Sequence, residues 1–264
     1  MKKGNLIWAV AVLLSGLMVS TGFSADLKEF KFGQILAMTG SGSWYGITME
    51  RGTAIAVEEI NKAGGVAGYK FSYAVEDHKS GLTTPAQNAF RKFTSIDKVS
   101  TIFSSFSAPT LSIMEMAKQK NILVWNGGAS SPMLTKVPFL YNTRMLGDEI
   151  LPFTLKYLYD KGGRTMATIY ANQTAPISLN QVAKEYWKKL GGTVVSEQMH
   201  ETGATDFTSE ASIMKAKNPD VIVCPSTGLD VGYVIKDVRK MGLKSYICGT
   251  EHSGDMEKVT GLAS

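Results

Sequence analysis

FKFGQILAMTGSGSWYG, residues 30–46, is the stretch that decides the fold. Its first part, residues 30–38, is an apolar run of strand-forming type, and residues 39–46 form a loop rich in glycine and serine. An amphipathic helix is expected next, ended by Gly64 and Gly65. Its predicted buried face holds Met49, Thr53, Ala56, Val57 and Ile60. A strand, a glycine-rich loop and a helix in this order are typical of a βα unit in a parallel sheet.

The same alternation continues along the chain. Further strands are predicted at residues 69–75, 99–103, 121–126, 138–146, 164–170, 193–198, 220–224 and 244–248. Helices are predicted at about 110–120, 148–160, 176–190, 206–217 and 229–241. One more helix is predicted to be capped by Thr84, with Pro85 at its first position. Its expected buried stripe is Ala86, Ala89, Phe90 and Phe93. The fold class is therefore α/β, with two lobes that each hold a mainly parallel sheet flanked by helices.

A second series of alternating helices and strands begins near Asp148, and we place the lobe boundary just before it. We expect the first lobe to span residues 25–143 and the second lobe to span residues 144–264. No low-complexity segment separates them, which predicts a short, structured hinge.

The N-terminus has the three-part layout of a secretory signal. Two lysines follow Met1, an apolar run extends from Leu6 to Val19, and small polar residues lead to Ser24. Residues 1–24 are therefore predicted to be a signal peptide cleaved near Ser24, and the mature protein is expected in the periplasm. A retained membrane anchor is the alternative, because the run from Leu6 to Phe23 approaches the length of a spanning helix.

Charge and cysteine content argue against a nucleic-acid-binding protein and against a fold held together by disulfides. Without Lys2 and Lys3 the chain has 26 basic and 23 acidic residues, a net charge of +3, which does not favour a nucleic-acid partner. The two cysteines, Cys224 and Cys248, are too few for a disulfide framework. We expect them to be buried thiols, and a single disulfide between them is the alternative.

Signatures of enzymes and metal sites are weak. The chain has no G-x-S-x-G or H-E-x-x-H motif, and its histidines, His78, His200 and His252, are scattered and expected at the surface. A metal site formed by Cys224, Cys248 and His252 would lack a fourth ligand. Neither a metal nor a catalytic residue is predicted.

An exported dinucleotide enzyme is the remaining enzymatic alternative. Gly40, Gly42 and Gly46 approximate the dinucleotide-binding fingerprint without matching its spacing. The bulky Trp44 and Tyr45 occupy the loop where a pyrophosphate would need close approach to the backbone. No cofactor is therefore expected.

Small polar loops follow three of the predicted strands. These loops are Thr39–Gly46, Ser104–Ser107 and Gly127–Ser131. Ligands of open parallel sheets bind beyond the carboxyl ends of the strands, and hydroxyls and helix-start amides suit a carboxylate. Helix capping is the alternative role for any single hydroxyl.

The order and spacing of several motifs resemble the branched-chain amino-acid-binding proteins of ABC importers. The likeness covers residues 30–264, and its strongest parts are MTGSGSWYG (38–46), INKAGGVAGYK (60–70), GGASSPMLT (127–135) and VRKMGLKSYICGTE (238–251). The resemblance implies the type I periplasmic-binding-protein fold, a hinged clamp without catalysis. It also implies an amino-acid-like ligand and an inner-membrane ABC permease as partner; we expect a monomer. A ligand-sensing subunit of a signalling system is the alternative function for the same fold.

The resemblance also implies roles for individual residues. In the first lobe, Ser105 or Ser107 would hold the ligand's α-carboxylate together with Gly128 and Ser130. Family members continue beyond the end of this chain, so we expect exposed apolar surface on one or both lobes.

The side-chain pocket and the ammonium site are implied in the same way. Tyr45 would wall the pocket beside Trp44, with loop packing as the alternative role for both. Glu251 would pair with the ligand's ammonium, with a solvated loop acid as the alternative. The chain departs from the family at residues 171–176, ANQTAP, and near Thr227 and Gly228, and Gly228 is expected at the ligand site, where many family members have an aromatic residue. These departures predict an enlarged or repolarised side-chain pocket, so leucine or valine is not assumed as the ligand.

Overall fold

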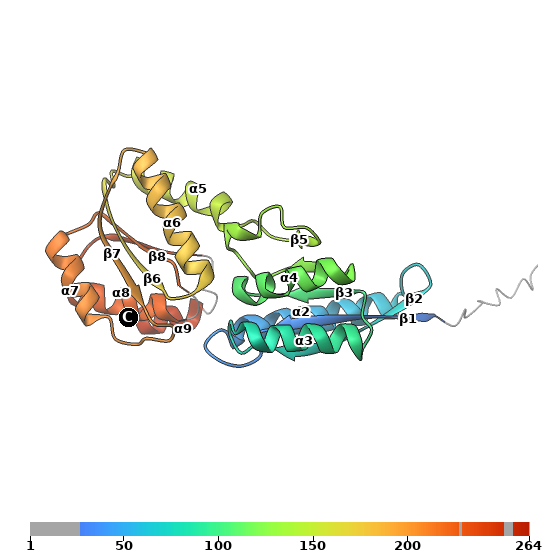
Figure 1. Ribbon diagram of the computed structural model, residues 1–264. Coiled ribbons are helices and arrows are strands. Elements are labelled where there is room, and N and C mark those ends of the chain that lie inside the picture. Colours follow the sequence, from blue (N-terminus) through green and yellow to red (C-terminus); the bar gives the residue numbers. More distant parts are fainter. Residues whose placement is uncertain (1–26, 227–228, 251–255, 264) are drawn as a thin grey trace, which may run out of the picture.

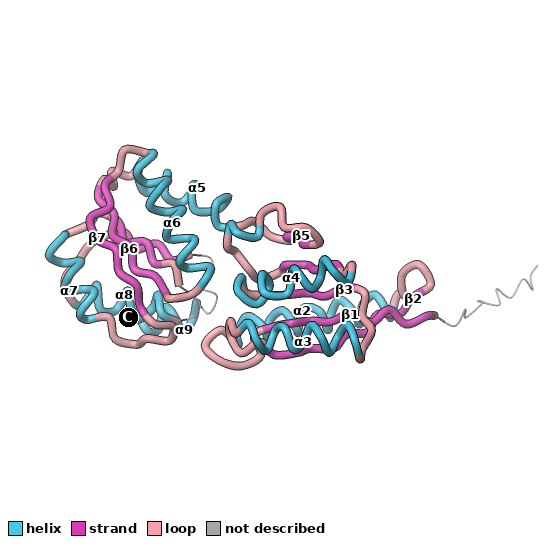
Figure 2. The backbone as a smooth tube through the Cα atoms, viewed as in Figure 1, coloured by secondary structure: helices cyan, strands magenta, loops and turns pink. Residues whose placement is uncertain are grey.

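The computed structural model describes residues 27–226, 229–250 and 256–263, and these form two lobes, each built on a parallel sheet (Figure 1). The first sheet has the strand order β2-β1-β3-β4-β5, and the second has the order β7-β6-β8-β9. Every strand pair within the two sheets is parallel. Figure 2 shows the two sheets as separate groups of strands surrounded by helices. The predicted α/β class with two lobes is confirmed.

The elements of the first lobe follow the predicted order. They are β1 (Lys28–Leu36), α2 (Ser43–Lys62), β2 (Tyr69–Asp77), α3 (Thr83–Ser95), β3 (Thr101–Ser104), α4 (Ser107–Lys120), β4 (Leu123–Asn126), the 3-10 turn η1 (Pro132–Leu134) and β5 (Leu140–Asn142). The predicted stripe of α3 is buried at Ala86, Ala89, Phe90 and Phe93. The helix begins at Thr83, and its N-cap is Leu82 without a side-chain cap, so the predicted cap at Thr84 was wrong.

Helix α2 begins inside the predicted loop. Its N-cap is Gly42, so Trp44 and Tyr45 lie in its first turn. Gly46 is buried there, and a Cβ atom at this position would lie 2.1 Å from the carbonyl oxygen of Ala37. Glycine is needed at residue 46 because the helix packs directly on the backbone after β1.

The first lobe has an apolar groove on the side of α2. It has a volume of about 710 Å³. Its lining includes Phe30, Phe32, Phe71, Phe103 and Trp125 from the sheet and Met49, Ala56, Val57 and Ile60 from α2. The expected apolar surface is therefore present on the first lobe.

The second lobe contains α5 (Gly147–Asp160), β6 (Thr165–Ala171), α6 (Thr174–Lys189), β7 (Thr193–His200), α7 (Thr208–Lys217), β8 (Val221–Cys224), α8 (Asp230–Lys240), β9 (Tyr246–Gly249) and α9 (Met256–Ala263). Helices α5 and α6 form one core with the sheet, and α7 and α8 form another. Helix α9 has no counterpart among the predicted elements. Its Val259 and Leu262 approach Gly232 of α8.

The two cysteines lie on neighbouring strands but on different faces of the second sheet. Cys224 belongs to the core beneath α7 and α8, whereas Cys248 packs against the core beneath α5 and α6. Side chains alternate between faces along a strand, and Cys248 is the partner of Val223 in the register, one residue from Cys224. Both cysteines are free thiols, as expected.

The lobes touch through the segment after β4. The N–H of Gly147 donates to the carbonyl of Ser130 at 2.8 Å, and the hydroxyls of Ser131 and Ser178 lie 2.8 Å apart. The predicted boundary between residues 143 and 144 falls in this connection, between β5 and α5. Among the described residues, no helix has both the length and the apolar character to cross a bilayer. The predicted signal peptide lies outside the described residues.

Candidate functional site

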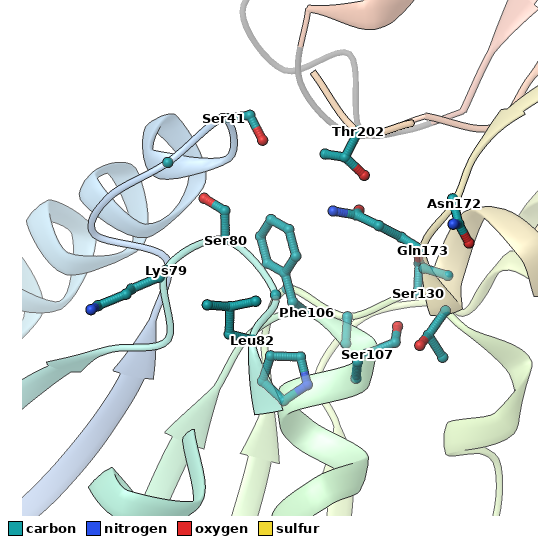
Figure 3. A pocket seen from close by; sticks show the side chains of 18 of the residues that line it. Ser41, Lys79, Ser80, Leu82, Phe106, Ser107, Ser130, Asn172, Gln173 and Thr202 are labelled. Atoms are coloured by element: carbon teal, nitrogen blue, oxygen red, sulfur yellow. The ribbon is translucent and has the colours of Figure 1, made fainter. Parts of the chain in front are cut away.

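A cavity of about 540 Å³ lies between the lobes (Figure 3). It is lined by residues 40–41, 79–82, 106–109 and 128–130 of the first lobe and by residues 172–175, 177 and 202 of the second lobe. Segments 40–41, 79–82, 106–109 and 128–130 follow β1, β2, β3 and β4, and the second-lobe segments follow β6 and β7. The cavity therefore occupies the place where parallel sheets bind ligands, beyond the carboxyl ends of the strands.

Four helices begin at the cavity. The N-caps of α3, α4 and α6 are Leu82, Phe106 and Gln173, and all three residues line it. Residues 40 and 41 of the lining lie directly before the N-cap of α2. The first N–H groups of a helix have no partner inside the helix, and its dipole is positive at this end. The cavity wall thus favours a negatively charged ligand group.

Ser107 is the first residue of α4 and lines the cavity. Its Oγ accepts the backbone N–H of Ser131 at 3.1 Å, which ties the loop after β4 to the start of α4. A hydroxyl that accepts one bond still has its proton to donate. Ser107 can therefore donate a hydrogen bond to a carboxylate in the cavity.

Asn126 organises the loop that contains Gly128 and Ser130. Its Oδ1 accepts the N–H groups of Gly128 at 3.2 Å and of Ala129 at 2.7 Å, and its Nδ2 donates to the carbonyl of Ala129 at 2.8 Å. A Cβ atom on Gly128 would lie 2.9 Å from the Cβ of Ser105, so only glycine fits against this serine. The Gly128 amide is thus engaged within the loop.

Hydrogen bonds join the loop after β2 to the loop after β1. Asp77 accepts the N–H groups of Met38 at 2.9 Å and Lys79 at 2.7 Å and the Thr39 hydroxyl at 2.5 Å. Burial would raise the pKa of Asp77, but these hydrogen bonds outweigh it and hold the pKa below its usual range. Ser80 Oγ donates to the Thr39 carbonyl at 2.6 Å. The two loops thus form one wall of the cavity.

The second lobe supplies amide and hydroxyl groups. Asn172, Gln173 and Thr202 are labelled in Figure 3, and the Gln173 side chain extends from the second lobe toward the Phe106 ring. A Cβ atom on Gly81 would lie 3.8 Å from Gln173 Nε2. Gln173 therefore reaches across the cavity to the first lobe. Among the described lining residues there is no aspartate or glutamate.

The structure separates the predicted first-lobe residues into two groups. Ser107, Gly128 and Ser130 line the cavity, whereas Ser105 lies behind the wall with its Oγ 2.9 Å from His78 Nε2. Trp44 and Tyr45 do not appear in the lining. The predicted Glu251 and Gly228 lie outside the described residues.

Tyr45 packs against a residue that lines the cavity. Its ring stands edge-on to the Phe106 ring at a centroid distance of 6.3 Å, and Trp44 is 39% exposed. Two residues predicted at the surface are buried instead, since His78 is 0% and His200 is 6% exposed. His252 lies outside the described residues.

Sequence reasoning missed residues 79–82, which line the cavity. These residues follow the second predicted strand, so the expectation that ligands bind beyond the carboxyl ends of the strands applies to Lys79, Ser80 and Gly81 as well. Within the described part of the chain, no group of three or more histidine, cysteine, aspartate or glutamate residues could hold a metal ion.

Known proteins match nearly the whole chain. The family model described as periplasmic binding protein covers residues 29–263. The Leu/Ile/Val-binding protein homolog 8 of Brucella suis biovar 1 is 23% identical over 247 residues, which are 89% of this chain and 61% of that protein. The chain thus spans about three fifths of the length of the curated relatives it matches.

Solved structures share the fold. The branched-chain amino acid transporter substrate-binding protein LivJ of Streptococcus pneumoniae, in complex with isoleucine, has a TM-score of 0.80 at 24% identity, covering 90% of this chain and 68% of that one. A solute-binding protein of an ABC transporter from Rhodopseudomonas palustris HaA2, in complex with p-hydroxybenzoic acid, has a TM-score of 0.80 at 18% identity, covering 90% and 66%. Because the family model matches most of its length, the chain belongs to the periplasmic binding protein family, and its relatives include branched-chain amino-acid-binding proteins.

Proposed function

We propose that the chain is a periplasmic receptor of an ABC importer, and that it captures a small carboxylate-bearing ligand, an amino acid or a close analogue, between its lobes. The observation that carries the proposal is the cavity at the strand ends of both lobes, into which four helices direct their N-termini. A carboxylate gains hydrogen bonds and a favourable dipole there.

The described lining residues include no carboxylate that would repel an anionic ligand group. Lys79 is the one charged residue among the described lining residues, and its ammonium group points away from the cavity in Figure 3. The negative charge would therefore be held by dipoles and hydroxyls. Ser107 fits this role because its oxygen already accepts the Ser131 N–H and its proton is left to donate.

The ligand's remaining part would meet a mixed surface. Phe106, Leu82 and Ile177 give the cavity apolar walls, and Asn172, Gln173 and Thr202 give it neutral polar groups. The relatives named above bind isoleucine in one case and p-hydroxybenzoic acid in another. An aromatic carboxylate is therefore a second candidate ligand, and the amide groups of the second lobe favour it because they can pair with a ligand hydroxyl.

A ligand screen by thermal denaturation tests the proposal. The panel contains amino acids, benzoate, p-hydroxybenzoate and short aliphatic carboxylates. A ligand at a hundred times its Kd stabilises the folded chain by about 2.7 kcal/mol, which raises Tm by roughly 5–10 °C at this chain length. The proposal fails if no compound of the panel raises Tm.

The Ser107→Ala variant then tests the carboxylate site. A hydrogen bond to a charged group contributes about 1.5–3 kcal/mol, so the affinity should fall roughly 10-fold to 150-fold. Ser112→Ala is the matched control, because the Ser112 hydroxyl lies on the same helix and donates to the Pro109 carbonyl at 2.7 Å. Equal affinities in the Ser107 and Ser112 variants would remove Ser107 from the site.

A further inference from the structure

His78 lies directly beneath the cavity. It follows β2, is 0% exposed, and stands between two segments that line the cavity, residues 79–82 and residues 106–109. It does not itself line the cavity. A fully buried histidine is uncommon, and its polar atoms need partners.

Both ring nitrogens of His78 have partners. The backbone N–H of Gly81 donates to Nδ1 at 3.1 Å, so Nδ1 carries no proton. The proton of the neutral ring is therefore on Nε2, which donates to Ser105 Oγ at 2.9 Å. Burial lowers the pKa of His78 to about 4, so this neutral form is the stable one at neutral pH.

The hydrogen bond to Gly81 supports a loop with an unusual backbone. Lys79 and Ser80 have φ angles of 53° and 57°, in the left-handed region, and Gly81 has a φ angle of 123°. Such conformations in residues other than glycine persist when the surrounding structure holds them. The carbonyl of His78 also accepts the N–H of Leu82 at 2.9 Å, so His78 is bonded to this loop twice.

The ring of His78 also supports Phe106. The two ring centroids are 5.2 Å apart at a tilt of 60°. Phe106 has a φ of 61° and a ψ of 139°, a conformation that residues other than glycine rarely adopt unless the surrounding structure holds them. The tip of the ring approaches Gly42, where an added Cβ atom would lie 2.4 Å from Phe106 Cζ. The Phe106 ring is therefore packed against both the loop after β1 and His78.

We propose that His78 is a positioning residue of the cavity, which holds the 79–82 loop and the Phe106 ring in place and so sets the size of ligand that the cavity accepts. The inference rests on the proposed function, because it concerns the ligand preference of the same cavity. His78 touches no ligand in this arrangement and acts through Gly81, Ser105 and Phe106.

The first measurement needs no ligand. Long-range ¹H–¹⁵N NMR of the protein at pH 7 should show a proton on Nε2 of His78 and none on Nδ1. In His78→Phe, amide exchange of Gly81 should accelerate at least tenfold relative to the core amide of Phe90. Tyr73→Phe is the matched control, since it removes one hydrogen bond, from the Tyr73 hydroxyl to Glu50 at 2.7 Å, elsewhere in β2. A proton on Nδ1, or unchanged Gly81 exchange in the His78 variant, would overturn the inference.

The second measurement is calorimetric titration with acetate, benzoate, p-hydroxybenzoate and L-isoleucine. His78→Phe should weaken the tightest of these probes about tenfold or more and reduce its preference over the others, while Tyr73→Phe keeps the preference. His78→Asn should recover part of the affinity, because its side-chain oxygen can accept the Gly81 N–H. Unchanged affinities in His78→Phe overturn the inference alone, whereas an unmodified protein that binds no probe refutes the proposed function and this inference with it.

Discussion

Acidification should destabilise the ligand-free protein through His78. The unfolded chain binds a proton on this residue below its ordinary pKa of 6.5, whereas the folded protein resists protonation until the pH nears about 4. Between these values the unfolded state holds more protons, so the free energy of unfolding falls as the pH falls. The neutral, buried ring therefore contributes stability that is complete above pH 6.5 and is lost as the pH drops toward 4.

The size of this effect follows from the difference between the two pKa values. Each pKa unit corresponds to about 1.4 kcal/mol, so the folded protein should lose about 3 kcal/mol between pH 7.5 and pH 4. The charge of Asp77 raises the pKa of His78, and the value of about 4 already includes this contribution. Asp77 itself has a lowered pKa, and its contribution to stability is lost only below its ordinary value of 3.8.

The assay is urea unfolding at about pH 7.5, 6.5, 5.5, 4.5 and 4, followed by tryptophan fluorescence. His78→Phe retains a ring at this position but cannot titrate, so its free energy of unfolding should depend less on pH than that of the unmodified protein. Tyr73→Phe should follow the unmodified protein, since the hydrogen bond to Glu50 and burial hold the pKa of Tyr73 at about 12, far from this range. Parallel pH dependences for the His78 variant and the unmodified protein would refute the reasoning.

Three further predictions concern other parts of the molecule. Gly147→Ala should destabilise the protein by about 1–3 kcal/mol in urea unfolding, because the new Cβ would lie 1.7 Å from Leu179 Cδ2; an unchanged midpoint would contradict this. Glu251→Gln should weaken an amino-acid ligand by about 2 kcal/mol or more in calorimetry while leaving a carboxylate without an amine nearly unaffected, and equal losses would refute the ammonium role. Thiol titration without reductant should find Cys224 and Cys248 unreactive in the native protein and two free thiols after unfolding, because burial raises both pKa values; a missing thiol would contradict the geometry.

The fold was predictable where apolar residues repeat with a regular period. The stripe of α3 has the helical spacing that places Phe90 and Phe93 on one face, and both are buried. The start of α2 was missed because Gly42, Ser43 and Gly46 are typical loop residues. Gly46 lies in the helix for a tertiary reason, the contact with the backbone at Ala37, and local composition does not reveal it.

The cavity was partly predictable from topology. Ligands of open parallel sheets bind beyond the carboxyl ends of the strands. This rule selected the loops after β1, β3 and β4, and residues of all three loops line the cavity. The burial of His78 was not predictable, because its neighbours Glu76, Asp77 and Lys79 make the segment polar. His78 is buried by Phe106 and Ser105, which are distant in sequence and approach it only in the folded lobe.

The two candidate serines, Ser105 and Ser107, have different surroundings because of the backbone conformation of the residue between them. Ser105 and Ser107 are chemically equal and two residues apart, and Phe106 between them has a φ of 61°. Ser105 faces inward to His78 and packs against Gly128, while Ser107 begins α4 at the cavity and receives the Ser131 N–H. The inner serine therefore connects the buried histidine to the loop after β4, and the outer serine presents its hydroxyl to the cavity. Both serines flank residue 106, so the backbone conformation of Phe106 positions the proposed carboxylate-binding hydroxyl of Ser107 and the apolar wall together.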